Sequence, residues 1–210
     1  MIRVLIADDH GIVRKGLIQI VQESPGIIVT GEASSGQEAL DLAFSQEFDV
    51  AILDIAMPGR GGLDILKSLK AEKPDLKIIM LSMYSEEQYA IRSLRDGASA
   101  YITKSNATDE LVKAIEMVAS GKRYITPSVA DRLATFIEED GHHLPHENLS
   151  DRELQVLVMI GSGKSVSDIA AELTLSIKTV STYRARLLEK MGIESNAQLI
   201  KYTLQHSLDQ

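Results

Sequence analysis

Val50-Ala51-Ile52-Leu53-Asp54 is the stretch of this 210-residue chain that decides its fold. Four apolar residues in succession, with no polar residue between them, are typical of a strand buried on both faces of a parallel sheet. The run ends directly in a carboxylate, Asp54. In such sheets ligands bind at the edge where the carboxyl ends of the strands meet. We therefore expect Asp54 to lie in a functional site at that edge.

Four other apolar runs repeat this pattern, at residues 2–7, 27–31, 77–81 and 100–102. The intervals between the runs are amphipathic. In residues 107–119, for example, apolar side chains recur at spacings of three and four, which indicates a helix. Short apolar strands that alternate with helices predict an α/β fold, in which helices cover both faces of a five-stranded parallel sheet.

The composition narrows the classes of function. The chain has no cysteine, which excludes disulfides, thiolate chemistry and cysteine-bound zinc. No apolar run approaches the roughly 20 residues that span a bilayer. Residues 1–4 lack the charged and apolar regions of a signal peptide. We expect a cytoplasmic protein that has no membrane partner.

The regular alternation stops near residue 121. Residues 127–137 still predict a short helix, with a proline in its first turn. Residues 138–146 are polar, charged and interrupted by Gly and Pro, which is typical of a linker. The expected domains are residues 1–121, a linker over 122–147 and a helical domain over 148–210.

The linker contains three histidines without a fourth metal ligand or a fixed scaffold, so we assign no metal site there. These histidines are His142, His143 and His146.

Acidic residues collect where the predicted strands end. Asp8 and Asp9 follow the first strand, and Asp54 ends the third. Three carboxylates at one edge repel one another and raise each other's pKa unless a cation lies among them. Mg²⁺ prefers oxygen ligands and binds alongside phosphoryl oxygens. The sequence therefore predicts a magnesium site at this edge.

One of these carboxylates can act as a nucleophile towards phosphorus, and Asp54 is the candidate. Lys104, after the fifth strand, supplies positive charge, and Ser82, at the end of the fourth, supplies a hydroxyl donor. Each residue alone has an ordinary explanation, because acids cap helices or form turns and lysines are commonly solvated. Their joint occurrence at four strand ends favours the functional interpretation.

Residues 1–121 resemble the receiver domain of bacterial response regulators, with the motifs of that family in order. These motifs are Asp8-Asp9-His10, Arg14 with Gly16-Leu17, Leu53-Asp54-Ile55-Ala56-Met57-Pro58 with Gly61-Gly62, Leu81-Ser82, and Gly97-Ala98 with Tyr101 and Lys104. The resemblance implies a flavodoxin-like (βα)5 fold and a sensor histidine kinase that phosphorylates Asp54. It also implies that Asp9 and Asp54 bind Mg²⁺ directly, Asp8 through water, and Ala56 through its backbone carbonyl.

The resemblance further implies a switch. Ser82 would turn towards the phosphoryl group and the ring of Tyr101 would move inward, which would bias a surface built on the fourth and fifth helices. Ordinary packing of a tyrosine at a strand end is the alternative for Tyr101. One position departs from the family, since many receivers have proline after the lysine. Ser105 follows Lys104 here, and the isomer of that peptide bond is left open.

After residue 148 every element is predicted to be helical. Ser150 and Glu153 form a capping box, residues 161–164 end the first helix, and Ser176 is suited to cap a helix over residues 177–191. Short helices with tight joins can present one helix to a DNA major groove. The apolar pattern leaves six residues of that helix outward: Lys178, Thr179, Ser181, Thr182, Tyr183 and Arg186.

Charge is divided unevenly along the chain. Seven Lys and Arg balance seven Asp and Glu in residues 148–210, so the first 147 residues carry the whole net charge of −8. Four basic residues of the last predicted segment oppose only Glu189 and can meet phosphates. They are Lys178, Arg184, Arg186 and Lys190. Such a cluster alone does not distinguish a DNA surface from a solvated face of a small helical bundle.

The whole segment resembles the LuxR-type DNA-binding domain. The matching motifs include Leu149-Ser150-Asp151-Arg152-Glu153, Val156-Leu157, Asp168-Ile169-Ala170, Ser176-Ile177-Lys178-Thr179-Val180 and residues 184–192. Joined to a receiver, this family is the NarL/FixJ type of response regulator. The resemblance implies that the six outward residues face double-stranded DNA, that Arg152 and Glu153 are structural, and that residues 196–206 contact a second copy in a homodimer. Tyr183 stands where the family often has histidine.

Together these resemblances predict a transcriptional regulator that phosphorylation of Asp54 switches, and not an enzyme. A phosphohydrolase with Asp54 as nucleophile is one alternative, but a second acid commonly stands two residues on, where this chain has Ala56. A constitutive DNA-binding protein with an inert receiver is the other. A damaged acidic pocket would favour it, and the pocket is intact in the sequence.

Overall fold

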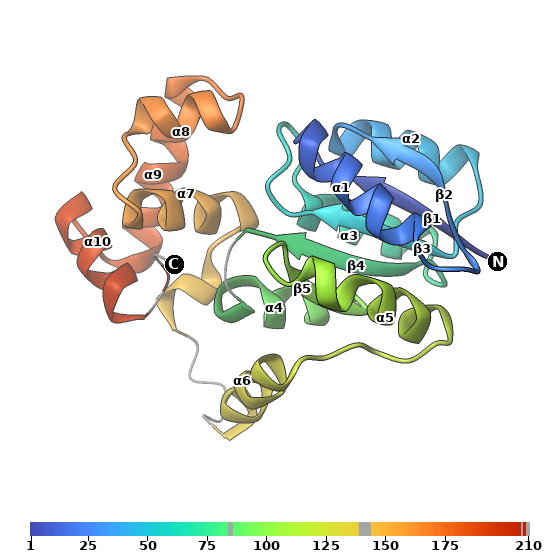
Figure 1. Ribbon diagram of the computed structural model, residues 1–210. Coiled ribbons are helices and arrows are strands. Elements are labelled where there is room, and N and C mark those ends of the chain that lie inside the picture. The colour runs from blue at the N-terminus through green and yellow to red at the C-terminus, as the bar shows by residue number, and fades with distance from the viewer. Residues whose placement is uncertain (84–85, 139–143, 207, 209–210) are drawn as a thin grey trace. The chain divides into compact units, whose positions relative to one another are not determined.

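The computed structural model describes residues 1–83, 86–138, 144–206 and 208. They form two compact units, residues 1–131 and 132–210 (Figure 1). The boundary between the units falls within helix α6 (Pro127–Glu138). The functional domains expected from the sequence, residues 1–121 and 148–210, stay predictions.

The first unit contains one parallel sheet in the strand order β2-β1-β3-β4-β5. Its strands are β1 (Ile2–Ala7), β2 (Ile27–Ala33), β3 (Val50–Asp54), β4 (Lys77–Ser82) and β5 (Ala100–Thr103). The three middle strands are buried almost throughout, as their unbroken apolar sequences predict. All five expected strands are present, and four of them extend one or two residues further than expected.

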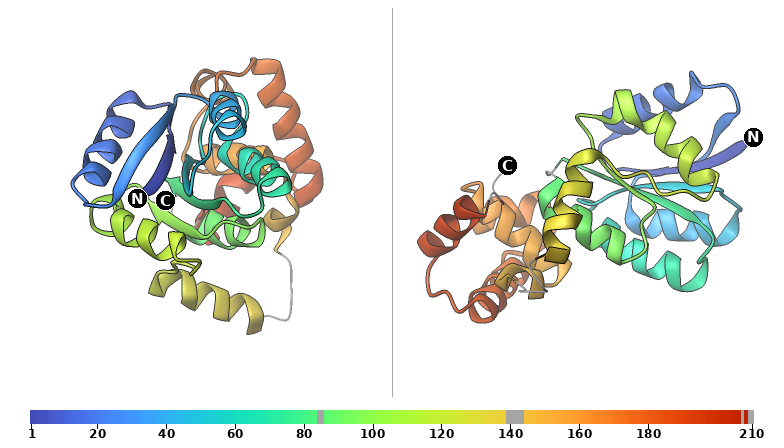
Figure 2. Two further views of the ribbon diagram at one scale, coloured as in Figure 1. Left: turned by 90° about the vertical axis from the view of Figure 1, so that its right-hand side faces the viewer. Right: turned by 90° about the horizontal axis from the view of Figure 1, so that it is seen from below.

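Five helices cover the sheet on both faces. They are α1 (Gly11–Gln22), α2 (Gly36–Ser45), α3 (Gly62–Glu72), α4 (Glu86–Arg95) and α5 (Ala107–Ala119). Helices α1 and α5 lie on one face, and α2, α3 and α4 lie on the other (Figure 2). The core side chains of α1 and α5, such as Leu17, Leu111 and Ile115, pack against the sheet. This confirms the flavodoxin-like (βα)5 fold.

Strand register brings the predicted site residues to one edge. Ala7 of β1 pairs with Leu53 of β3, so the residues that follow them, Asp8 and Asp54, are neighbours. Ser82, the last residue of β4, pairs with Thr103, which directly precedes Lys104. All these groups therefore lie at the carboxyl edge of the sheet, where ligands bind in this class of fold.

The first unit continues beyond α5. Tyr124 forms an isolated parallel bridge with Ala100, and Val129 in α6 is buried. The side chain of Thr126 accepts the Val129 N–H at 3.3 Å, which caps the start of α6. The predicted helix over residues 127–137 is confirmed. Residues 139–143 of the expected linker, including His142 and His143, lie outside the described residues.

The described residues of the second unit form helices joined by short loops. It contains the 3-10 helix η1 (Pro145–Asn148) and the helices α7 (Asp151–Gly161), α8 (Val166–Glu172), α9 (Ile177–Met191) and α10 (Asn196–Gln205). A serine side chain accepts a backbone N–H at the start of each of these four α-helices. The predicted capping box of Ser150 and Glu153 is confirmed, and Ser165 forms a second box with Asp168.

Helices α8 and α9 form the helix-turn-helix. Leu173, Val180 and Leu187 are buried in their shared core. The turn begins at Thr174, which has a left-handed φ of 53°. Its N–H donates to Ala171, and the next N–H, from Leu175, donates to Ala170. This is the Schellman pattern, in which glycine is usual because it has no Cβ.

Among the residues that the structure describes, no helix combines the length and the apolarity needed to cross a bilayer.

Candidate phosphoacceptor pocket and nucleic-acid interface

The centre of the first site is a buried cluster of two acids and one lysine. Asp8 is 0% and Asp54 is 1% exposed. The Nζ atom of Lys104 lies 2.7 Å from Oδ2 of Asp8 and 2.9 Å from Oδ2 of Asp54. The backbone N–H of Lys104 donates to the Ser82 carbonyl at 2.7 Å. The fourth and fifth strands therefore fix the lysine over both carboxylates, as the placement at strand ends predicts.

Two residues before α1 complete the acidic cluster. Four residues each offer one possible ligand atom, and these four atoms all lie within 4.8 Å of one another. The residues are Asp8, Asp9, His10 and Asp54. Nδ1 of His10 lies 2.9 Å from Oδ1 of Asp9 and 3.4 Å from Oδ1 of Asp8. Sequence reasoning placed His10 in a family motif but gave it no role. Its position directly after two acids was the available signal.

Arg14 supports the same edge from α1. Its Nη1 donates to the Asp8 carbonyl at 2.6 Å, and its Nε lies 3.8 Å from Oε2 of Glu32 on β2. The arginine thus ties the end of β1 to both α1 and β2. It too was part of a motif without an assigned role.

Burial and charge oppose each other in the pocket. Burial raises the pKa of Asp54 above its usual 3.8, and the charge of Asp8 adds to this, while Lys104 acts in the other direction. Burial also disfavours the charged form of Lys104, but the two carboxylates outweigh this effect and raise its pKa. The positive charge of Lys104 therefore opposes the effects of burial and of Asp8 on the pKa of Asp54.

The donor set suits a hard divalent cation. Three carboxylates face one ammonium, so the ionised pocket has two negative charges in excess (three minus one). Oxygen donors and this excess charge are what Mg²⁺ requires. Ala56, the remaining predicted ligand, is partly buried, and its N–H lies 3.4 Å from Oδ1 of Asp54. The role of its carbonyl stays a prediction.

The two predicted switch residues are both inside the fold. Ser82 and Tyr101 are each 1% exposed. The ring of Tyr101 is thus packed inside the fold, and the switch roles of Ser82 and Tyr101 stay predictions. No peptide bond in the described chain is cis, so the bond between Lys104 and Ser105 is trans.

Gly62 contacts the loop that follows Asp54, the predicted phosphoacceptor. Its N–H donates to the Ile55 carbonyl at 3.1 Å. A Cβ atom at this position would lie 2.1 Å from the carbonyl oxygen of Asp54. Because that oxygen is backbone, no rotamer change can relieve the clash. The start of α3 can therefore approach Asp54 only if residue 62 is glycine.

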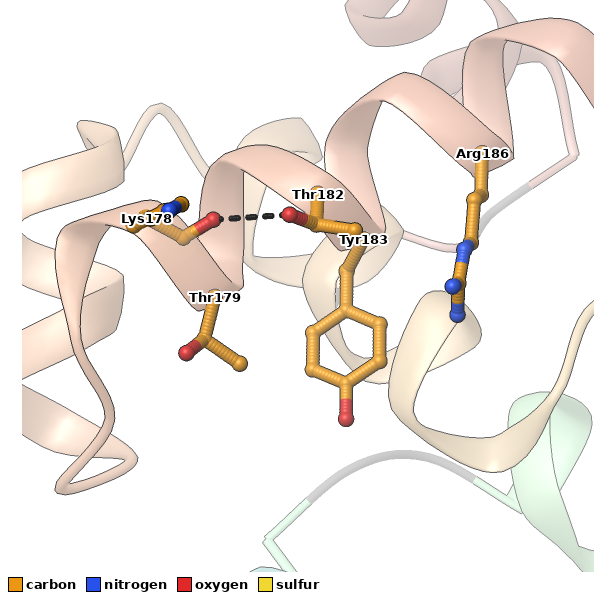
Figure 3. Close-up of a pocket in the computed structure, with 5 residues that line it drawn as sticks. All are labelled: Lys178, Thr179, Thr182, Tyr183 and Arg186. Carbon is orange, nitrogen blue, oxygen red and sulfur yellow. Dashed lines mark hydrogen bonds between the residues drawn. The ribbon is translucent and has the colours of Figure 1, made fainter.

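The second candidate site is one face of α9. Five of the six predicted residues line a shallow hollow of about 270 Å³ (Figure 3). They are Lys178, Thr179, Thr182, Tyr183 and Arg186. Ser181 is exposed but lies outside this hollow, because the helical repeat turns it roughly 130° from the centre of the other five.

The basic cluster of α9 divides into two pairs. Nε of Arg184 donates to Oδ1 of Asn196 at 2.6 Å, and Nζ of Lys190 lies 2.7 Å from Oε2 of Glu153. Both side chains thus stabilise the unit itself. Lys178 and Arg186 have no side-chain partner within the described part of the chain, and both are exposed. They remain the cations available to an external anion.

Comparison with known families identifies a domain type for each part of the chain. A sequence profile of the response regulator receiver domain matches residues 4–116, and one of the luxR family of bacterial regulatory proteins matches residues 147–203. Response regulator UvrY of Escherichia coli strain K12 is 39% identical over 209 residues, which covers 99% of this chain and 96% of the relative. Response regulator GacA of Pseudomonas aeruginosa is 37% identical over 209 residues, covering 99% and 98%.

Solved structures of similar proteins share the fold over nearly the whole chain. The RcsB response regulator of Salmonella typhimurium superposes with a TM-score of 0.70 at 28% identity, covering 98% of each chain. RcsB of Salmonella enterica serovar Typhimurium, bound to promoter rprA in the presence of the phosphomimetic BeF3−, gives a TM-score of 0.65 at 27% identity, covering 96% of this chain and 97% of that one.

The fold and its acidic edge define a receiver joined to a helix-turn-helix. The chain belongs to the two-component response regulators of the NarL/FixJ type, which combine a receiver with a LuxR-type DNA-binding domain. It is a transcriptional response regulator and not an enzyme.

Proposed function

We propose that a sensor histidine kinase phosphorylates Asp54, and that this promotes homodimerisation and binding to double-stranded promoter DNA. The observation that carries the proposal is the buried Asp54 carboxylate with Lys104 Nζ at 2.9 Å. A carboxylate in this position has a fixed cation for the phosphoryl oxygens and lies at the sheet edge where ligands bind.

In the proposed step, a carboxylate oxygen of Asp54 attacks the phosphorus of a phosphohistidine. An oxygen–phosphorus bond forms, the phosphorus–nitrogen bond breaks, and its electron pair returns to the imidazole of the kinase. Lys104 neutralises charge on the transferred group, and Ser82 donates its hydroxyl to a phosphoryl oxygen. Asp9, Asp54 and the Ala56 carbonyl would hold Mg²⁺ directly and Asp8 through water. The ion supplies positive charge to the phosphoryl oxygens.

Phosphorylation also redistributes charge around Lys104. Its Nζ contacts both Asp8 and Asp54, so a phosphoryl group on Asp54 would compete for the same ammonium. We propose that the response of Ser82 and Tyr101 to this change shifts the surface of α4, β5 and α5 and so favours the dimer. Residues of α10 would supply the contact between the two DNA-binding domains.

For DNA, the proposal rests on the face of α9. The side chains of Lys178, Thr179, Thr182, Tyr183 and Arg186 point outward from one side of this helix (Figure 3), with Ser181 on the adjoining flank. A helix that presents cations and polar groups in this way can enter a major groove. The RcsB structure on a promoter supports the same use of the fold.

The test is labelling with acetyl phosphate and Mg²⁺, read by intact mass and size-exclusion chromatography. Wild type should gain one phosphoryl group and shift towards the dimer. Asp54→Ala should gain none, and Asp75→Ala, which removes an exposed aspartate, should behave as wild type. Equal labelling of the wild type and Asp54→Ala would refute the phosphoacceptor. A wild type that takes no label would favour a constitutive DNA-binding protein with an inert receiver.

A further inference from the structure

We propose that Thr179 and Thr182 recognise thymine through their methyl groups, and that each half-site therefore contains two thymines in neighbouring base pairs. The inference rests on the proposed function, because it requires α9 to lie in the major groove. It goes further by assigning the chemistry that these two side chains read.

The hydroxyl of Thr182 is already in use. Its Oγ1 donates to the carbonyl oxygen of Lys178 at 2.9 Å, one turn back along the helix (Figure 3). A hydroxyl has a single proton to donate. Thr182 therefore has no donor left for the acceptor atoms of a purine. Its oxygen can still accept a hydrogen bond, and its Cγ2 methyl is the apolar group that it can offer to a base.

The side-chain oxygen of Thr179 also has a partner within the protein, in this case the residue that caps the start of α9. Oγ1 of Thr179 lies 2.8 Å from Oγ of Ser176, the N-cap of α9, and the same Ser176 Oγ accepts the Thr179 N–H at 3.0 Å. The cap thus fixes the side chain of Thr179 as part of the start of the helix. Both threonines are anchored by their oxygens within the hollow that they share with Lys178 and Arg186.

A fixed methyl group has one natural partner in the major groove. Of the four bases, only thymine carries an apolar group there, its C5-methyl. Three residues along an α-helix advance by about 4.5 Å, and neighbouring base pairs are about 3.4 Å apart. Two methyl groups at this spacing are far enough apart to reach adjacent base pairs.

The flanking side chains fit this register. Lys178 and Arg186 are eight residues apart, which is about 12 Å along the axis. They stand on either side of the threonines on the same face, where they can reach phosphates and fix the position of the helix. The threonines then lie over the base edges between these contacts.

The experiment uses the full phosphorylated chain and a duplex that it selects from a random pool. Each thymine of that duplex is replaced singly by deoxyuridine, which removes only the C5-methyl. Binding should fall about three- to fivefold at two neighbouring positions in each half-site, and stay within twofold elsewhere.

Two variants separate the methyl from the hydroxyl. Thr182→Val keeps the methyl and should retain both the affinity and the response to deoxyuridine. Thr182→Ser keeps the hydroxyl and should bind the thymine and deoxyuridine duplexes equally at one of the two positions. Thr30→Ser, which makes the same change at an exposed threonine of β2 in the first unit, is the matched control and should change neither.

The possible failures are distinguishable. If the chain selects a duplex but no deoxyuridine weakens binding, the methyl assignment is wrong and the proposed function stands. If Thr182→Val loses affinity while Thr182→Ser keeps it together with its response to deoxyuridine, the hydroxyl is the reading group and the inference is overturned. If the phosphorylated chain binds no duplex from the pool, both the proposed function and this inference fail.

Discussion

Nζ of Lys190, in the last turn of α9, lies 2.7 Å from Oε2 of Glu153, in the first turn of α7. The same oxygen accepts the Ser150 N–H at 2.8 Å. One carboxylate, 3% exposed, therefore closes the capping box of α7 and joins it to α9. Burial raises the pKa of Glu153, but the hydrogen bonds from Lys190 and Ser150 outweigh it and hold the pKa below the usual 4.5.

This pKa predicts an acid-sensitive DNA-binding domain. Because the folded-state pKa is lowered, the ionised carboxylate stabilises the fold fully above about pH 4.5, and this contribution is lost as pH falls through the folded-state value. Glu153→Gln should lower the free energy of unfolding by about 1 to 3 kcal/mol at pH 7. The difference from wild type should shrink on acidification.

This effect can be measured by unfolding the protein in urea and monitoring hydrogen exchange in peptides that cover residues 148–191. Glu189→Gln, which changes an exposed carboxylate on α9, is the control and should cost little at any pH. A Glu153→Gln deficit that stays constant down to pH 3 would contradict the role of the ionised form.

Removal of Lys104 should destabilise the first unit in a way that Mg²⁺ repairs. Lys104→Ala leaves Asp8 and Asp54 buried without their shared cation, which should cost about 3 to 5 kcal/mol without metal. Saturating Mg²⁺ should raise the melting temperature of the variant more than that of wild type, because the ion replaces the missing charge. Thermal melts with and without MgCl2 test this. Lys15→Ala, which removes an exposed lysine of α1, should change stability by less than about 1 kcal/mol.

Gly62→Ala should disturb the phosphoacceptor loop although the change adds one methyl group. The new Cβ would meet the Asp54 carbonyl at 2.1 Å, so either α3 or the end of β3 must move. We expect slower labelling by acetyl phosphate and a lower melting temperature. Gly16→Ala, at an open position of α1, should stabilise the same unit by up to about 1 kcal/mol. Wild-type labelling by Gly62→Ala would show that the loop adapts.

The turn of the helix-turn-helix offers a stabilising change. Thr174 is exposed and has a φ of 53°, a region that costs an L-residue about 1 to 2 kcal/mol. Thr174→Gly should raise the free energy of unfolding of the second unit by about 0.5 to 1 kcal/mol. The gain is smaller than the relieved strain because glycine loses more conformational entropy on folding. Gly163→Ala, at a φ of 82° in the equivalent position after α7, should have the opposite sign. Urea unfolding compares the two, and a loss of stability in Thr174→Gly would contradict the assignment of strain.

Lys178 and Arg186, which have no side-chain partner among the residues that the structure describes, should account for part of the salt dependence of DNA binding. Lys178→Ala or Arg186→Ala should weaken binding to duplexes of any sequence if each contacts a phosphate, and should lower the slope of log affinity against log salt by about one. Fluorescence anisotropy over a salt series measures the slope. Lys15→Ala, an equal change of charge on α1, is the control. An unchanged slope in both α9 variants would reject this face as the DNA surface.

The sequence alone determined the elements and the chemistry at their ends. Unbroken apolar runs such as residues 50–53 specify strands buried on both faces, and the polar residue after each run must then lie at the carboxyl edge of the sheet. Serines before amphipathic stretches likewise marked the starts of α7 and α9. These signals are readable because they depend on neighbours a few positions away in the chain.

Tertiary structure alone decided the contacts that the positions of the strand ends do not imply. His10 and Arg14 acquired partners in the pocket only when α1 packed beside β1 and β2. Two of the four basic residues of α9 have partners far away in the sequence. Arg184 contacts Asn196, 12 positions away, and Lys190 contacts Glu153, 37 positions away. Such contacts depend on how helices and strands pack across long separations, and local periodicity carries no information about the distance between side chains on different elements.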